Sequence, residues 1–173
     1  MKMRLLAPAL LSIVPLQVTG AETSAHFQIP EALVAEHKAL HVTLGRAVRE
    51  TGTLGAAARS VEQVLHPHFQ REEEIALPPL ALLPRLARGE TPPEMREVLR
   101  MTDQLEAELP KMLEEHKKVV AALSAFRREA VAAGREEYVE FADELTLHAQ
   151  NEEQVLYPAA LLVGRFVKLQ LKQ

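Results

Sequence analysis

The stretch "VLHPHFQREEEIALP" covers residues 64–78, and "ELTLHAQNEEQVLYP" covers residues 144–158. In both, a histidine is followed by glutamate four and five residues later and by proline ten residues later. The two histidines, His68 and His148, are 80 residues apart. The same polar pattern therefore occurs twice, each time within a stretch whose apolar residues have the spacing of a buried helix.

A second pair of stretches repeats in the same order. "EHKALHVTLGRAVRE" (36–50) and "EHKKVVAALSAFRRE" (115–129) share Glu-His-Lys, a leucine eight residues after the glutamate, and a closing Arg-Glu. Their histidines, His37 and His116, are 79 residues apart. An internal duplication of one helical hairpin explains both repeats. Two such hairpins predict an all-α, up-down four-helix bundle.

Prolines and glycines set the expected helix boundaries, because they occur where helices begin and end. We expect helices over residues 30–52, 54–77, 94–133 and 135–157. Within them, Pro67 predicts a bend and Pro110 an interruption. Residues 78–93 read as a Pro-rich connector with a short helical turn, whose leucines pack on the end of the bundle. Pro158 is expected to end the fourth helix or to bend it.

Composition excludes several classes of protein. Hydrophobic residues make up 47% of the 173 residues, which suits one globular domain, here residues 26–173. The formal net charge of -4 with interspersed signs gives no basic surface, so we expect no nucleic-acid partner. The absence of cysteine excludes disulfides, thiolate metal sites and cysteine nucleophiles. No Ser-His-Asp or phosphate-loop pattern supports a hydrolytic enzyme.

The N-terminus has the layout of a secretory signal. "MKMR" is basic, "LLAPALLSIVPL" is a short apolar run, and the residues up to Ala21 are small and polar. We expect residues 1–21 to be a signal peptide and the protein to be exported to a bacterial periplasm or secreted. The run is too short to span a membrane, so stable membrane insertion of the mature form is not expected. The alternative is a cytoplasmic protein with an irregular N-terminus.

Each predicted helix carries one histidine on its apolar stripe, and the second helix of each hairpin adds a glutamate one turn later. The four stripes are Leu33, His37, Leu40 and Leu44; Val61, Leu65, His68, Glu72 and Ile75; Met112, His116, Val119, Leu123 and Phe126; and Phe141, Leu145, His148, Glu152 and Val155.

Two carboxylates in one core are costly unless something cancels their charge. Two bound divalent cations would do so, and imidazole nitrogen with carboxylate oxygen suits iron, manganese or zinc. With four histidines and two bridging glutamates, each metal would receive two histidines and share both carboxylates. Coordination positions would stay open for a small ligand. The alternative is a hydrogen-bonded polar layer without metal.

"EHKAL", "HPHFQREEEIALPP", "EEHKKV" and "LHAQNEEQVLYP" resemble the hemerythrin-like (HHE cation-binding) family of di-iron four-helix bundles, over about residues 29–162. The resemblance implies two iron ions, with Glu72 and Glu152 bridging and the other ligands at His37, His68, His116 and His148. Oxygen-carrying members have His-x-x-x-His in the third helix, where this chain has Val120, and an Asp after the last histidine. The chain is more similar to the symmetric four-His, two-Glu variants.

The remaining polar residues are assigned by their position. His41, one turn after His37, is either a fifth imidazole ligand or a residue at the rim of the site. Glu73 and Glu153 point about 100° away from the ligands and are expected to contact ligand imidazoles. We expect Tyr157 to be a packing residue, and the following to be solvated or on the surface: His26, Glu36, His66, Glu74 and Glu115.

Three functions remain open on the sequence alone. The first is a di-iron protein that binds or reacts with oxygen, peroxide or nitric oxide, as a sensor or scavenger. The second stores iron or donates it to damaged iron centres. The third is a metal-free helical interaction module. The sequence names no protein partner and does not decide whether the protein is an enzyme.

Overall fold

The computed structural model describes residues 27–90 and 95–172. The described residues are helical and contain no strand. The four long helices of the bundle are α1 (Glu31–Ala47), α2 (Gly52–Arg71), α4 (Arg96–Ala132) and α5 (Glu136–Asn151). Contacts join α1 to α2, α2 to α4, α4 to α5 and α5 to α1, which closes the ring of an up-down bundle. The predicted fold class is confirmed.

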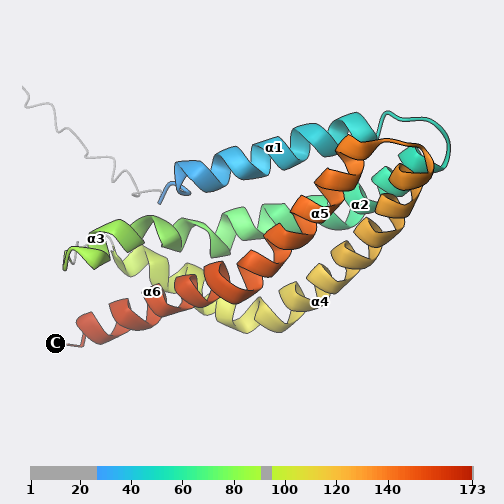
Figure 1. Cartoon of the computed structure of the whole chain (residues 1–173). Helices are drawn as coiled ribbons and strands as arrows, with labels where there is room; N and C mark the ends of the chain where they lie inside the picture. The colour runs from blue at the N-terminus through green and yellow to red at the C-terminus, as the bar shows by residue number, and fades with distance from the viewer. Residues whose placement is uncertain (1–26, 91–94, 173) are drawn as a thin grey trace, which may run out of the picture.

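The loops of the two hairpins lie at the same end of the bundle. Figure 1 shows the α1–α2 and α4–α5 connections at one end of the bundle and the C-terminus at the other. The connector between the hairpins forms a 3₁₀ turn, η2 (Pro78–Leu82), and the short helix α3 (Leu83–Ala87). Leu80 and Leu82 are buried there, as expected of leucines packing on the end of the bundle.

Both glutamates of the repeated pattern start a π-helical turn. These turns are η1 (Glu72–Ala76) and η4 (Glu152–Leu156), and each closes with a backbone N–H bonded to the glutamate carbonyl, from Leu77 and Tyr157 respectively. A proline follows each turn, and it cannot donate to the carbonyl four residues back, so the regular α-helical ladder cannot continue. The wider turn absorbs this break, as π-bulges do.

The second π-turn overturns the expectation for Val155 in the fourth helix and excludes one of the two outcomes expected at Pro158. Val155, predicted to face the core, is 53% exposed, and Tyr157 is buried in its place. The reason is the extra residue per turn, which shifts the inward face. The helix also continues beyond Pro158 as α6 (Tyr157–Gln170), with the proline in its first turn.

Pro110 does not interrupt the third helix, since α4 runs unbroken from Arg96 to Ala132. Its ring lies on the exposed face of α4. Water can therefore satisfy the carbonyl that loses its backbone partner, and the prediction of an interruption was wrong. α2 likewise runs through Pro67.

Among the described residues, no helix has both the length and the hydrophobicity needed to cross a membrane. The expected signal peptide at residues 1–21 and His26 lie outside the described residues.

The apolar core is divided along the bundle axis. One cluster, near the hairpin loops, contains Leu44, Leu123 and Leu145. A second cluster, toward the connector, contains Ile75, Met112 and Tyr157. On α4, for example, Met112 belongs to one cluster and Val119 to the other, with His116 between them. A layer of buried polar residues therefore separates two apolar regions.

Candidate metal centre

The polar layer contains the six residues that the sequence singled out. Each is at most 4% exposed: His37, His68, Glu72, His116, His148 and Glu152. They come from α1, α2, η1, α4, α5 and η4, so all four arms of the bundle contribute. Polar side chains buried this deeply need partners, and their atoms divide into two groups.

The first group joins α2 and α4. His68 Nε2 lies 3.1 Å from Glu72 Oε1, and His116 Nε2 lies 3.7 Å from the same oxygen. Glu152 Oε2 is 3.4 Å from His116 Nε2. One ligand atom from each of these four residues lies within 4.8 Å of all the others, the closeness expected of donors to one ion.

The second group joins α1 and α5. Glu152 Oε1 lies 3.1 Å from His148 Nε2 and 3.7 Å from His37 Nε2. Ligand atoms of these three residues are again within 4.8 Å of one another. Glu72 Oε2 is 3.9 Å from His37 Nε2, so each glutamate turns one oxygen toward each group. That is the arrangement of two carboxylates bridging two ions.

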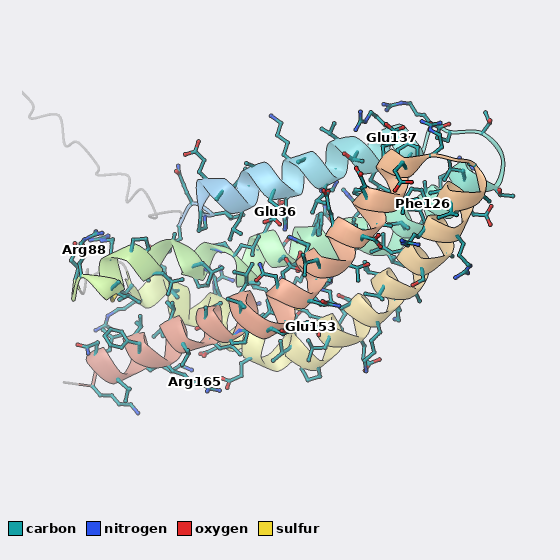
Figure 2. All side chains as sticks on the ribbon, viewed as in Figure 1. Glu36, Arg88, Phe126, Glu137, Glu153 and Arg165 are labelled. Atoms are coloured by element: carbon teal, nitrogen blue, oxygen red, sulfur yellow. The ribbon has the colours of Figure 1, made fainter. Side chains whose placement is uncertain are left out.

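Each of the four histidines is held at its other nitrogen by a glutamate from the next helix. Nδ1 donates to Glu73 from His37 at 3.2 Å, to Glu115 from His68 at 3.0 Å, to Glu153 from His116 at 2.9 Å, and to Glu36 from His148 at 3.0 Å. Figure 2 shows Glu36 on α1 and Glu153 on the α5–α6 arm. This contact fixes the ring and leaves the Nε2 lone pair facing the centre, as in metal-binding histidines.

The carboxylates control the protonation of the metal-free layer. Burial lowers the pKa of His116, but Glu152 and Glu72 outweigh it and raise the pKa to about 10. For His148, burial is likewise outweighed by Glu152 and Glu36, and the pKa is about 9. Burial raises the pKa of Glu152, yet the imidazoles of His116, His148 and His37 beside it hold that pKa well below its usual range. Without metal, protons therefore balance the buried negative charge.

Among the described residues, four buried ligand atoms have no partner with hydrogen-bond geometry: His37 Nε2, Glu72 Oε2, His148 Nε2 and Glu152 Oε1. Three of them are the ligand atoms of the second group, and the fourth, Glu72 Oε2, lies 3.9 Å from His37 Nε2. An unpaired buried polar atom costs about 1–3 kcal/mol, so four together need an explanation. A cation bound among nitrogen and oxygen donors supplies one, and the mixed donor set fits iron, manganese or zinc.

In the first group, the Tyr157 phenol lies beside the histidine nitrogens that face the centre. Its phenol donates to Glu72 Oε1, and its oxygen lies 3.4 Å from His68 Nε2 and 3.2 Å from His116 Nε2. The ring stacks on His116 with centroids 5.6 Å apart. Burial, followed by the charges of Glu72 and Glu152, raises the pKa of Tyr157, so the metal-free protein keeps the phenol protonated.

His41 belongs to neither donor group among the described residues. It is exposed, and its ring meets Phe69 and His66 edge-on, at centroid distances of 5.1 and 6.2 Å. Burial lowers the pKa of His41. His66 is exposed, as expected. His41 therefore lies at the rim of the site and not in the donor layer.

For the residues that surround the six buried polar residues, the sequence predicted some roles and missed others. Glu73 and Glu153 contact ligand imidazoles as expected, and Glu74 is exposed and pairs with Arg71 at 2.6 Å. Sequence reasoning missed the hydrogen-bonding role of Glu36 and Glu115 and the central place of Tyr157. The repeated Glu-His dipeptide at 36–37 and 115–116 was the signal that could have identified the first two.

A groove of about 490 Å³ borders the centre between α1 and α5, and Glu36 and His148 are among its lining residues. Its walls also include Leu40, Phe141 and Leu147. A second groove, of about 400 Å³, has His116 and Glu153 in its lining. Each donor group therefore has one histidine beside an accessible, largely apolar surface.

Comparison with known protein families agrees with this geometry. The model of the hemerythrin HHE cation-binding domain matches residues 28–160. Neither the comparison with curated proteins nor the comparison with solved structures gave a match. The matched range covers all four bundle helices and every residue of the two donor groups. The chain therefore belongs to the hemerythrin HHE cation-binding domain family.

Proposed function

We propose that the six-residue centre holds two iron ions and that the protein uses them to bind or react with oxygen, peroxide or nitric oxide. One ion would be held by His68 and His116, the other by His37 and His148, with Glu72 and Glu152 shared. Bound iron would supply a redox-active site with open coordination positions for a small molecule.

The four buried atoms without a hydrogen-bond partner carry the proposal, because each lies 3.1 to 3.9 Å from another of them. The remainder of the chain supports it by holding the donors. Glu73 and Glu36 hold His37 and His148 from outside, so the imidazoles stay aimed inward. Phe69 stacks on His37 at a centroid distance of 4.1 Å and excludes water from that side. The groove beside His148 offers a small apolar molecule a way in.

The test starts from metal-free protein loaded with ferrous iron under nitrogen. On exposure to air, peroxide or nitric oxide, the proposal predicts a new near-ultraviolet or visible absorption for at least one of them. Glu152→Ala should abolish it, because Glu152 belongs to both donor groups. His66→Ala is the matched control, an exposed histidine outside the centre. Iron that binds but leaves the spectrum unchanged with all three reagents would contradict the proposed reactivity.

Iron storage or donation is the second candidate, favoured by the accessible grooves beside His148 and His116. Incubation of iron-loaded protein with an apo iron–sulfur acceptor distinguishes the two. Transfer of iron to the acceptor supports donation, whereas iron that stays bound supports the gas-binding function.

We also propose that residues 1–21 are a signal peptide and that the protein is exported. N-terminal sequencing of the mature form tests this. A start near residue 22 is expected, and a mature chain that begins at Met1 would contradict export.

A further inference from the structure

The two donor groups are not equivalent, although the hairpins that build them are repeats. Leu77 and Tyr157 occupy matching positions, since each follows a π-turn and donates its backbone N–H to the glutamate that begins it. Each is also followed by a proline. One side chain carries a phenol and the other has no donor atom. Only one of the two groups can therefore gain an oxygen from this position.

The Tyr157 oxygen lies at ligand spacing from its neighbours. It is 3.2 Å from His116 Nε2 and 3.4 Å from His68 Nε2. Donors that each bind one ion at about 2.1 Å are separated by about 3.0 to 3.4 Å when they occupy neighbouring positions. Glu72 Oε1, at 3.1 Å from His68 Nε2, fits the same spacing. The Tyr157 oxygen thus lies beside donor atoms of three residues of the first group: His68, Glu72 and His116.

The distribution of unpaired atoms agrees with this. The nitrogens His68 Nε2 and His116 Nε2 both have the phenol as neighbour, whereas His37 Nε2 and His148 Nε2 have no hydrogen-bond partner among the described residues. The Tyr157 ring is 1% exposed and stacked on His116, so its oxygen cannot swing away without disturbing the core.

We propose that the Tyr157 phenolate is a further ligand of the metal held by His68 and His116, which leaves the metal at His37 and His148 as the one open to a small molecule. This rests on the proposed function, since it requires metal in both groups. On binding, the Tyr157 O–H bond breaks, the proton passes to solvent, and the oxygen donates an electron pair to the metal. No change of oxidation state occurs in this step.

The experiment uses the full chain loaded with ferrous iron under nitrogen, oxidised with ferricyanide and desalted. A phenolate bound to ferric iron gives a visible charge-transfer band and phenolate modes in the resonance Raman spectrum. The chain has two tyrosines. Tyr138, at the other end of the bundle, donates to Glu50 at 3.0 Å and provides the matched control. The band should persist in Tyr138→Phe and disappear in Tyr157→Phe.

Iron content, measured on the same samples, separates the two proposals. Two ferric ions per chain without a visible band would overturn phenolate ligation and leave the metal centre intact. A band that survives in Tyr157→Phe would also overturn it. Absence of bound iron would overturn both. If Tyr157→Phe does not fold, Tyr138→Phe still decides, because any remaining phenolate must then be Tyr157.

Discussion

Removing the charge of Glu115 should weaken metal binding although this residue is not a proposed ligand. Its carboxylate accepts from His68 Nδ1 at 3.0 Å, with 25% of the side chain exposed. Burial raises the pKa of Glu115, but His68 outweighs it and the net shift is downward, so the group is charged at neutral pH. Glu115→Gln keeps the shape and an acceptor oxygen but loses the charge that strengthens the bond and makes the imidazole a better donor.

The size of the effect follows from this contact. Changes to groups that hold a metal-binding histidine typically reduce metal affinity about 10- to 100-fold, or about 1.4 to 2.7 kcal/mol. Among the four outer glutamates, Glu115 is the least exposed, ahead of Glu153 at 38%, Glu36 at 43% and Glu73 at 45%. Since water screens the exposed charges more strongly, Glu115→Gln should have the largest effect of the four.

The assay is a competitive titration of metal-free protein with ferrous iron or zinc against a chelator of known affinity. Glu74→Gln is the matched control, because it removes the same charge from a side chain that is 63% exposed and pairs with Arg71. The control should bind metal as the unmodified chain does. Affinities of Glu115→Gln and Glu74→Gln within twofold of each other would refute the reasoning.

Three further predictions concern protons, metal and packing. With pKa values of about 10 and 9, His116 and His148 are protonated in the metal-free protein at pH 7. Metal binding should then release about two protons or more, so affinity rises with pH up to about pH 10. A pH-indicator titration in weak buffer measures the release, and affinity that is constant between pH 6 and 9 would contradict the prediction. Since metal would bind the folded donor layer and not the unfolded chain, removing it should lower the free energy of unfolding. Equal denaturation curves with metal and with excess chelator would argue against this. A Cβ on Gly164 would lie 2.2 Å from Thr102 Oγ1, whereas nothing lies within 4 Å of one on Gly45. In urea titrations Gly164→Ala should cost about 1–3 kcal/mol and Gly45→Ala should stabilise the protein by up to about 1 kcal/mol; a neutral Gly164→Ala would show that α4 and α6 can move apart freely.

The donor layer could be predicted from the sequence because it depends on spacing along single helices. A histidine and a glutamate four residues apart share one face, and the internal repeat placed this pair twice. Since each histidine also lies on an apolar stripe, burial of that stripe carried the histidine into the core. His68 and Glu72 illustrate this, at 2% and 0% exposed.

The features that the sequence did not predict depend on how neighbouring helices meet, or on turns that depart from the regular α-helical spacing. Glu36 and Glu115 contact histidines on other helices, and the sequence of one helix does not say which neighbour it meets. Val155 was predicted to face the core but is exposed, because helical periodicity assumes 3.6 residues per turn, whereas η4 adds a residue. The proline ten residues after His68 and His148 marked both π-turns, but a proline alone is compatible with a helix end.

Iron-edge anomalous diffraction from crystals of the loaded protein tests the central claim most directly, since it locates each metal ion independently of any activity. The account predicts two peaks inside the bundle, one beside His68 and His116 and the other beside His37 and His148, with Glu72 and Glu152 between them. A single peak, a peak outside the polar layer, or no peak in protein exposed to excess iron would contradict it.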